Sequence, residues 1–212
     1  MTEPDVTLTD YGLVLECGLL AALLCRRGDP PRPLRRWFAL FFAATAVASL
    51  AGATVHGFFL DTATVGARVL WPAALVAIGG AALAAWGIGA HLQFSEAAAR
   101  WIARGAAFEF VAYATAVVAG AQTFAIAVFN YLPAALFLLV VLALAYRRGR
   151  ERAALLGVAG MLLTFLAAGV QMARVPLHAR YFTHNAFYHL IQGVALLLLF
   201  GSARSITRRR PC

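Results

Sequence analysis

Seven apolar runs, separated by shorter segments rich in arginine, glycine or proline, divide the sequence. A membrane-spanning helix needs about 20 consecutive apolar residues, and each run is close to that length. The pattern therefore predicts an all-α protein, a bundle of seven transmembrane helices forming a single domain over residues 1–212. Thr9 and Asp10 are typical helix-capping residues at the start of the first run. The expected spans are residues 8–25, 37–59, 67–90, 102–120, 123–146, 153–172 and 185–204.

Composition strengthens this interpretation, because hydrophobic residues make up 62% of the chain and charged residues only 13%. Soluble domains carry about 25% charged residues. The net charge of +9 would suit a nucleic-acid-binding protein, but the arginines lie in short clusters between the apolar runs, as in loops that face anionic lipid. We therefore expect membrane lipids as partners and no nucleic acid. Arginine without lysine, together with abundant alanine, favours a bacterial plasma membrane as the location.

The arginine clusters also predict which way the chain crosses the membrane. They follow the first, third and fifth spans, as in Arg26–Arg36 and Arg147–Arg152, and they recur in the C-terminal tail. In a seven-span chain these segments all lie on one side. Because cytoplasmic loops are enriched in arginine, we predict that the N-terminus and the loop Arg174–Thr183 lie outside and that the C-terminus is cytoplasmic.

With this topology, most polar side chains inside the spans lie near the outer face. A helix rises about 1.5 Å per residue, which places them within roughly 10–12 Å of that face. Polar residues at membrane depth are costly and commonly mark functional sites. The pattern therefore predicts a cavity open to the outside. The residues at this depth are Glu16, His56, Asn130, Gln171, Asn185, His189 and Gln192.

The start of the last span holds the densest group of polar residues. Asn185 and His189 are four residues apart, so they lie about 40° apart on a helix and face the same way. His184 and His189 are five residues apart and diverge by about 140°. His184 could therefore join His189 at one metal ion only if it precedes the regular helix and turns its ring toward His56.

Seven spans, a histidine at the outer end of the second, and the sequence NAFYHLIQG in the seventh resemble the superfamily of alkaline ceramidases and adiponectin receptors. In that superfamily two histidines of the seventh span and one of the second bind zinc, and a serine precedes the latter. His56 and His189 match two of the histidines. The remaining histidine position falls on Asn185, beside His184, and the serine position falls on Gly52.

The resemblance implies a zinc ion bound by His56, His184 and His189, with Asn185 and Gln192 supporting the ligands. It also implies an acidic residue and a serine that steady the attacking water. The candidates in this chain are Glu16 or Asp61 for the acid and Ser49, two turns before His56, for the serine. A shared ion requires the imidazoles of His56 and His189 to approach within about 6 Å, so spans two and seven should be neighbours.

Three functions remain open from the sequence. The first is a membrane-embedded, zinc-dependent hydrolase of a lipid amide or ester, in which the metal lowers the pKa of a bound water. The second is a non-catalytic lipid-binding or sensor protein on the same scaffold, favoured by asparagine at position 185 and glycine at position 52. The third is a haem-binding electron carrier with His56 and His189 as axial ligands.

Overall fold

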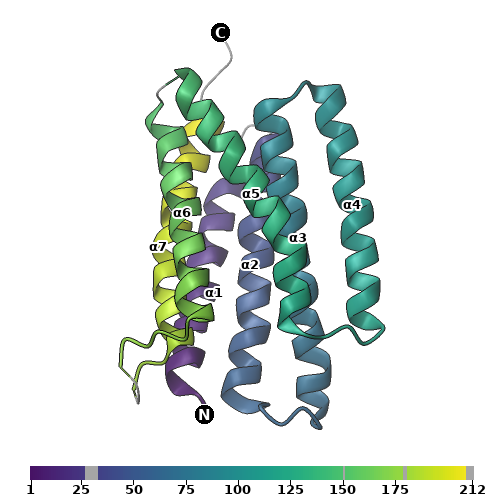
Figure 1. Ribbon diagram of the computed structural model, residues 1–212, viewed down its shortest axis with the longest axis vertical. Helices are drawn as coiled ribbons and strands as arrows, with labels where there is room; N and C mark the ends of the chain where they lie inside the picture. The colour runs from purple at the N-terminus through teal and green to yellow at the C-terminus, as the bar shows by residue number, and fades with distance from the viewer. Residues whose placement is uncertain (27–32, 150, 179–180, 209–212) are drawn as a thin grey trace.

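The computed structural model describes residues 1–26, 33–149, 151–178 and 181–208. Within these residues the chain forms seven helices, each long and apolar enough to cross a membrane, which confirms the predicted all-α class and number of helices. Figure 1 shows them running along one long axis, with the two ends of the chain at opposite ends of the bundle. The helices are α1 (Pro4–Cys25), α2 (Pro33–Phe58), α3 (Val65–Gln93), α4 (Glu96–Val118), α5 (Phe124–Gly149), α6 (Arg152–Met172) and α7 (His184–Arg208).

The start of α1 differs from the expectation. Helix α1 begins at Pro4, and Glu3 occupies the N-cap position, so the prediction that Thr9 and Asp10 cap this helix is wrong. Proline suits the first helical turn because its missing N–H would have no partner there. Thr9 fits inside the helix because its hydroxyl donates to the Asp5 carbonyl oxygen one turn earlier, at 2.8 Å. Asp10 consequently lies within the span.

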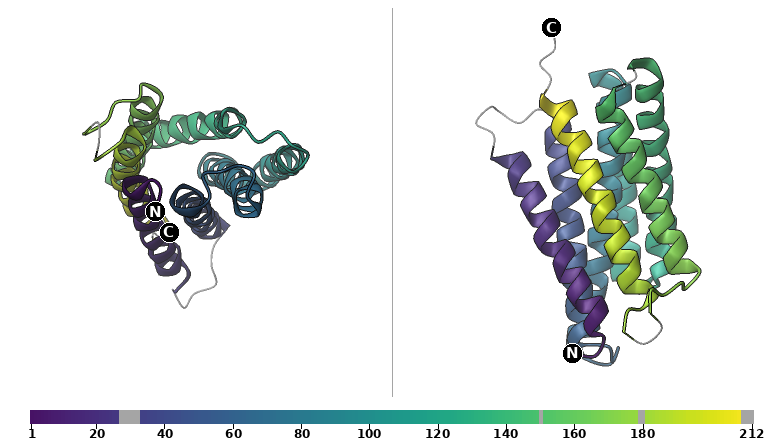
Figure 2. Two further views of the ribbon diagram at one scale, coloured as in Figure 1. Left: turned by 90° about the horizontal axis from the view of Figure 1, so that it is seen from below. Right: turned by 90° about the vertical axis from the view of Figure 1, so that its left-hand side faces the viewer.

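Six of the helices form a closed ring. In order around the ring, α1, α2, α3, α5, α6 and α7 each pack against the next, and α7 returns to α1. Helix α4 lies outside this ring against α3. The two views of Figure 2 show α1 and α7 side by side, although they come from opposite ends of the sequence. Helices α2 and α7 touch as well, but α1 lies between them in the ring, so the predicted pairing of spans two and seven is met only by a small contact.

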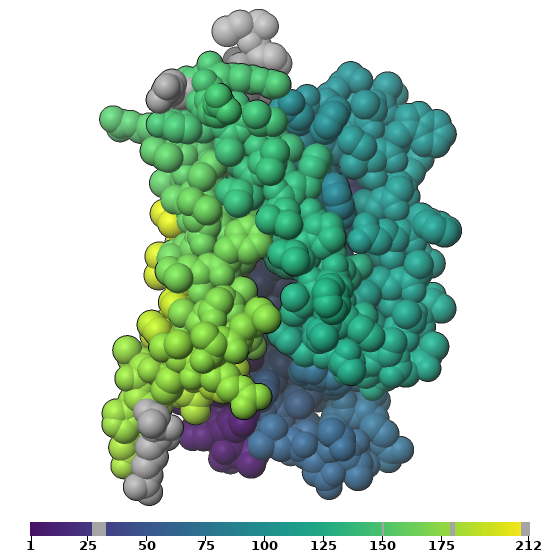
Figure 3. All heavy atoms as spheres, in the orientation of Figure 1, coloured from purple at the N-terminus to yellow at the C-terminus, as the bar shows by residue number. Residues whose placement is uncertain are grey.

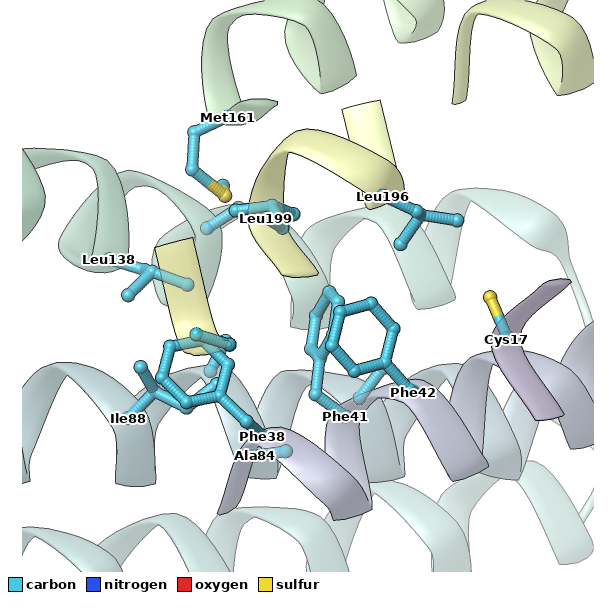
Figure 4. Packing of buried hydrophobic residues seen from close by; sticks show 14 of the residues in the cluster. Cys17, Phe38, Phe41, Phe42, Ala84, Ile88, Leu138, Met161, Leu196 and Leu199 are labelled. Atoms are coloured by element: carbon cyan, nitrogen blue, oxygen red, sulfur yellow. The ribbon is translucent and has the colours of Figure 1, made fainter. Parts of the chain in front are cut away.

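The densest packing fills the half of the bundle that lies toward the C-terminus. Large side chains from several helices meet there, as Figure 4 shows for Phe38, Phe41 and Phe42 of α2 against Leu196 and Leu199 of α7. Phe42 also contacts Phe200 edge to face, with ring centroids 6.1 Å apart. Interdigitating side chains of this size leave little free space at the axis.

The sequence of α2 explains why the other half is less full. Its first turns read WFALFF (37–42), whereas the following turns read AATAVASLAGA (43–53). The change from aromatic to small side chains occurs about halfway along the helix. Small side chains on one helix leave volume that neighbouring helices at fixed spacing do not fill, so a cavity in this half is expected.

Hydrogen bonds at the N-terminal end fix α1 between α2 and α7. The backbone N–H groups of Thr2 and Glu3 donate to carbonyl oxygens at the end of α2, those of Gly57 (3.1 Å) and His56 (3.3 Å). On the other side, the Asp5 carboxylate accepts from the backbone N–H and the hydroxyl of Thr183, at 2.8 and 2.7 Å. Thr183 immediately precedes α7, so these contacts set the position of α1 relative to both helices.

Candidate functional site

A cavity of about 420 Å³ occupies the half of the bundle nearer the N-terminus. Helices α1, α2, α3, α5, α6 and α7 all contribute to its wall, and apolar side chains dominate the lining. Its volume lies within the range of about 300–1,000 Å³ that is usual for small-molecule sites. The apolar part of the wall includes small residues such as Ala48, Gly52, Ala74, Ala127 and Ala168.

One side of the cavity is polar, where α1, α2 and α7 come together. Asp10 of α1, only 5% exposed, hydrogen-bonds with Ser49 of α2. The Asp10 Oδ1 atom also lies 3.4 Å from Nε2 of His189 in α7. A side chain at Gly52 would crowd this carboxylate, since a Cβ there would lie 3.3 Å from Asp10 Oδ2. We call Asp10, Ser49 and His189 the polar wall of the cavity.

Thr9 of α1 is the second partner of the His189 ring. Its hydroxyl lies 3.0 Å from Nδ1 of His189, and it can also donate to the carbonyl oxygens of Asp5 and Val6 at 2.8 and 3.0 Å. Since Nε2 faces Asp10, both ring nitrogens of His189 lie beside polar groups of α1. These contacts hold the imidazole ring in the polar wall.

Neutral amides extend the polar surface away from this wall. Gln171 of α6 donates to the Oδ1 atom of Asn185 at 3.4 Å, and Gln192 donates to the Thr164 hydroxyl, also at 3.4 Å. The Gln192 side chain is 8% exposed, and its Oε1 atom has no hydrogen-bond partner among the residues that the structure describes. All four residues line the cavity, so an acceptor is available on its surface.

His56 lies at the N-terminal end of the same cavity. Its Nδ1 atom is 2.5 Å from Oε2 of Glu3, the residue that caps α1. This pair sits beside the backbone contacts that join the start of the chain to α2. The side chains of His56 and Glu3 are 26% and 39% exposed, so the pair is much more accessible than the polar wall.

Of the eight residues that the resemblance assigned to the zinc site, the structure brings five to the cavity and leaves three elsewhere. Those at the cavity are Ser49, His56, Asn185, His189 and Gln192. Glu16 instead packs against α7, where its Oε2 atom would lie 3.0 Å from a Cβ at Gly193. Asp61 lies in the α2–α3 loop and accepts from the Ala63 N–H at 2.9 Å. His184 is the first residue of α7, so the prediction that it precedes the regular helix is wrong.

Asp10 is the polar-wall residue that sequence reasoning missed. The buried residues of α1 recur every three or four positions, and Asp10 stands in this series between Val6 and Leu13. Its helical phase was therefore a usable signal once the helix was known to start at Pro4. The expected span of residues 8–25 includes Asp10, but treating it as a cap of the helix concealed that phase.

The histidines as they lie do not make the expected zinc site. In the described ranges, no group of three or more His, Cys, Asp or Glu side chains is arranged to hold a metal ion. Both ring nitrogens of His189 already face protein groups, Thr9 and Asp10, and Nδ1 of His56 faces Glu3. A zinc ligand must present a free nitrogen lone pair to the ion. The zinc site stays a prediction from the resemblance.

The cavity reaches the surface between α5 and α6. Leu132 of α5 and Met172 of α6 both line it, and they are 39% and 79% exposed. Figure 3 shows a fissure between these two helices, with atoms of deeper helices visible through it. In a membrane-spanning bundle, an opening on the side of the helices faces lipid acyl chains.

Comparison with known proteins identifies a family but no activity. The sequence model of a family of unknown function, DUF6962, matches residues 6–208, nearly the whole chain. No curated protein and no solved structure matches the chain. A relation to the alkaline ceramidases and adiponectin receptors is therefore not shown, and that resemblance stays a prediction.

Proposed function

The chain belongs to this family of unknown function, and we propose from its geometry that it binds a lipid-like amphiphile inside the membrane. The observation that carries the proposal is the cavity, which combines an apolar lining with a small polar wall. Sites for amphiphilic small molecules have this composition, in which apolar surface gives affinity and a few polar groups fix the orientation. The head group would contact Asp10, Ser49 and His189.

The opening between α5 and α6 supports access from the bilayer. An acyl chain could pass between Leu132 and Met172 without leaving its apolar surroundings. Pro133 follows Leu132 and removes one backbone hydrogen bond from α5. That loss makes this part of the helix easier to bend than a regular helix, which suits a passage for ligands.

The arginine distribution supports a bundle oriented with the cavity in the outer half of the membrane. Arg26, Arg100, Arg147 and Arg208 all lie at the end of the bundle opposite to the N-terminus, and arginine favours the cytoplasmic side. The cavity lies at the N-terminal end. In a bacterial plasma membrane it would thus receive amphiphiles from the outer leaflet.

Binding fits the polar wall better than hydrolysis does. Ser49 hydrogen-bonds with Asp10, whereas a serine nucleophile requires a hydrogen bond to the histidine that takes its proton. Ser49, Asp10 and His189 are therefore arranged to bind a polar head group and not to activate the serine. Zinc-dependent hydrolysis of a lipid amide and haem binding through His56 and His189 stay predictions from the sequence. Both functions need His189 as a ligand, and both of its ring nitrogens face protein groups here.

A direct test compares two alanine-to-phenylalanine variants on α2. Ala48 lines the cavity, whereas Ala43 is exposed on the outer face of the same helix. Protein in lipid nanodiscs is titrated with dodecyl amphiphiles that carry alcohol, amine, carboxylate or phosphate head groups. We expect saturable binding of at least one of them, abolished by Ala48→Phe and retained by Ala43→Phe. Absence of saturable binding by every amphiphile would contradict the proposed function.

A further inference from the structure

The charges around the cavity restrict what its ligand can carry. The chain contains no lysine, and no arginine is found among the described residues that line the cavity. The ionisable groups on the lining are Asp10, His56 and His189, with two tyrosines, Tyr131 and Tyr188. Each histidine already faces a carboxylate, His189 that of Asp10 and His56 that of Glu3. No unmatched positive charge is therefore present in this set.

An anionic head group would find no cationic side chain on such a surface to pair with. Carboxylates and phosphates are held in apolar sites by arginine or by several N–H donors, because an unpaired charge is costly to remove from water. Here the head group would meet the Asp10 carboxylate instead, which is almost fully buried. Arg147 and Arg148 end α5 at the other end of the bundle. Arg68 at the start of α3 and Arg174 after α6 lie at the same end as the cavity, but both are exposed and neither lines it.

The deeper part of the cavity offers an acceptor that requires a donor. Gln192 uses its N–H group on Thr164, and its buried Oε1 atom has no partner in the described part of the chain. A buried acceptor of this kind is normally satisfied by a hydrogen bond. Because Gln192 lines the cavity, a bound molecule with an O–H or N–H group can supply that bond.

From these observations we infer that the cavity selects amphiphiles whose head group carries a hydrogen-bond donor and no negative charge, namely alcohols and amines. This inference rests on the proposed function and names the ligand class of the same site. The donor bonds with Gln192 Oε1 or with the Asp10 carboxylate, and the chain occupies the apolar remainder of the cavity. Carboxylates and phosphates of equal chain length are rejected, since no arginine or lysine on the lining compensates their charge.

The test ranks five dodecyl compounds by competition against tritiated dodecanol, with the protein in nanodiscs and each compound's partition into empty nanodiscs subtracted. They are dodecanol, dodecylamine, dodecanoate, dodecyl phosphate and dodecane. We expect dodecanol and dodecylamine to bind at least about tenfold more tightly than the other three. Tighter or equal binding of dodecanoate or dodecyl phosphate would overturn the inference and leave the proposed function standing. If dodecane binds as well as dodecanol, the required donor is refuted.

Two variants assign the effect to named groups. Gln192→Leu keeps the side-chain volume and removes the acceptor, so dodecanol should bind about fivefold to tenfold more weakly. Gln93→Leu is the matched control, because Gln93 does not line the cavity. It is the last residue of α3 and accepts a hydrogen bond from Arg148. If Gln192→Leu binds dodecanol unchanged, water serves this acceptor and the inference is wrong.

Discussion

The two halves of the bundle are built from the same helices but are filled differently. Toward the C-terminus, phenylalanine and leucine side chains such as Phe42 and Leu196 meet at the axis and are fully buried. Toward the N-terminus, the same α2 and α7 helices present Ser49, Gly52 and His189 around a cavity of about 420 Å³. One half therefore holds the helices together, and this leaves the other free to keep polar groups and empty space at membrane depth.

The difference arises from side-chain size and polarity along single helices. Helix α7 begins with His184 and Asn185 and continues into the apolar run VALLLLF (194–200). Helix α2 runs in the opposite direction and changes from aromatic to small residues. Because the two helices run antiparallel and touch across the ring, their bulky parts lie at the same level of the bundle, and so do their small and polar parts. The cavity thus depends on matched patterns in at least two helices.

The largest expected loss of stability comes from creating a cavity in the packed half of the bundle, the half toward the C-terminus. Phe42→Ala should lower the free energy of unfolding by about 3–5 kcal/mol, because Phe42 is completely buried against Phe41 and Phe200. Denaturant unfolding of the protein in detergent measures it. The control Val47→Ala, on the same helix but 53% exposed, should change stability by less than about 0.5 kcal/mol. Equal losses in the two variants would show that the packed half is not the source of stability.

A paired enlargement tests the two halves against each other. Ala84 is fully buried in the packed half, so Ala84→Phe should cost about 1–3 kcal/mol through overpacking. Ala48→Phe places the same ring in the cavity and should change the free energy of unfolding by less than about 1 kcal/mol. Thermal unfolding of both variants in the same detergent measures the two losses of stability. A larger loss for Ala48→Phe than for Ala84→Phe would mean that the cavity does not accept a ring.

A smaller loss of stability is expected from breaking the hydrogen bonds between α1 and the start of α7, at the cavity end of the bundle. Asp5→Ala removes the acceptor of two hydrogen bonds from Thr183 and should cost about 1–2 kcal/mol. Because the loss is local, amide exchange should accelerate at the start of α7, at Phe187, whose N–H donates to the Thr183 carbonyl. The matched variant Asp61→Ala alters only a turn in the α2–α3 loop and should leave exchange at Phe187 unchanged. Unchanged exchange at Phe187 in Asp5→Ala would show that the Asp5–Thr183 contact does not stabilise the start of α7.

The helices could be predicted from the sequence, but only some of the residues of the candidate site could. The spans could be predicted because continuous apolar runs of sufficient length have no other stable arrangement. His189 and Gln192 could be identified because their polarity stands out within such a run. The neighbours of His189 could not, since Thr9 and Asp10 come from the far end of the chain and pack against it only in the folded ring. The helix start at Pro4 was decisive, because a cap position for Asp10 hid its buried phase.

The cavity itself could not be derived from any one span. Its existence depends on which helices are neighbours, and the exclusion of α4 from the ring is not encoded in the apolar pattern. Its opening depends on the spacing of α5 and α6, which are consecutive helices with an exposed leucine and methionine at the gap. Pairwise packing of this kind is decided by side-chain shape, to which hydropathy is insensitive.

Photolabelling tests directly whether an amphiphile binds in the cavity. A dodecanol carrying a diazirine near the chain terminus is activated with the protein in nanodiscs, and labelled peptides are mapped by mass spectrometry. We expect adducts on the cavity-lining stretches of α5 and α6, residues 124–132 and 164–172, that disappear with excess dodecanol and in Ala48→Phe. Adducts confined to outward-facing positions such as Leu15 and Phe108, without competition by dodecanol, would contradict it.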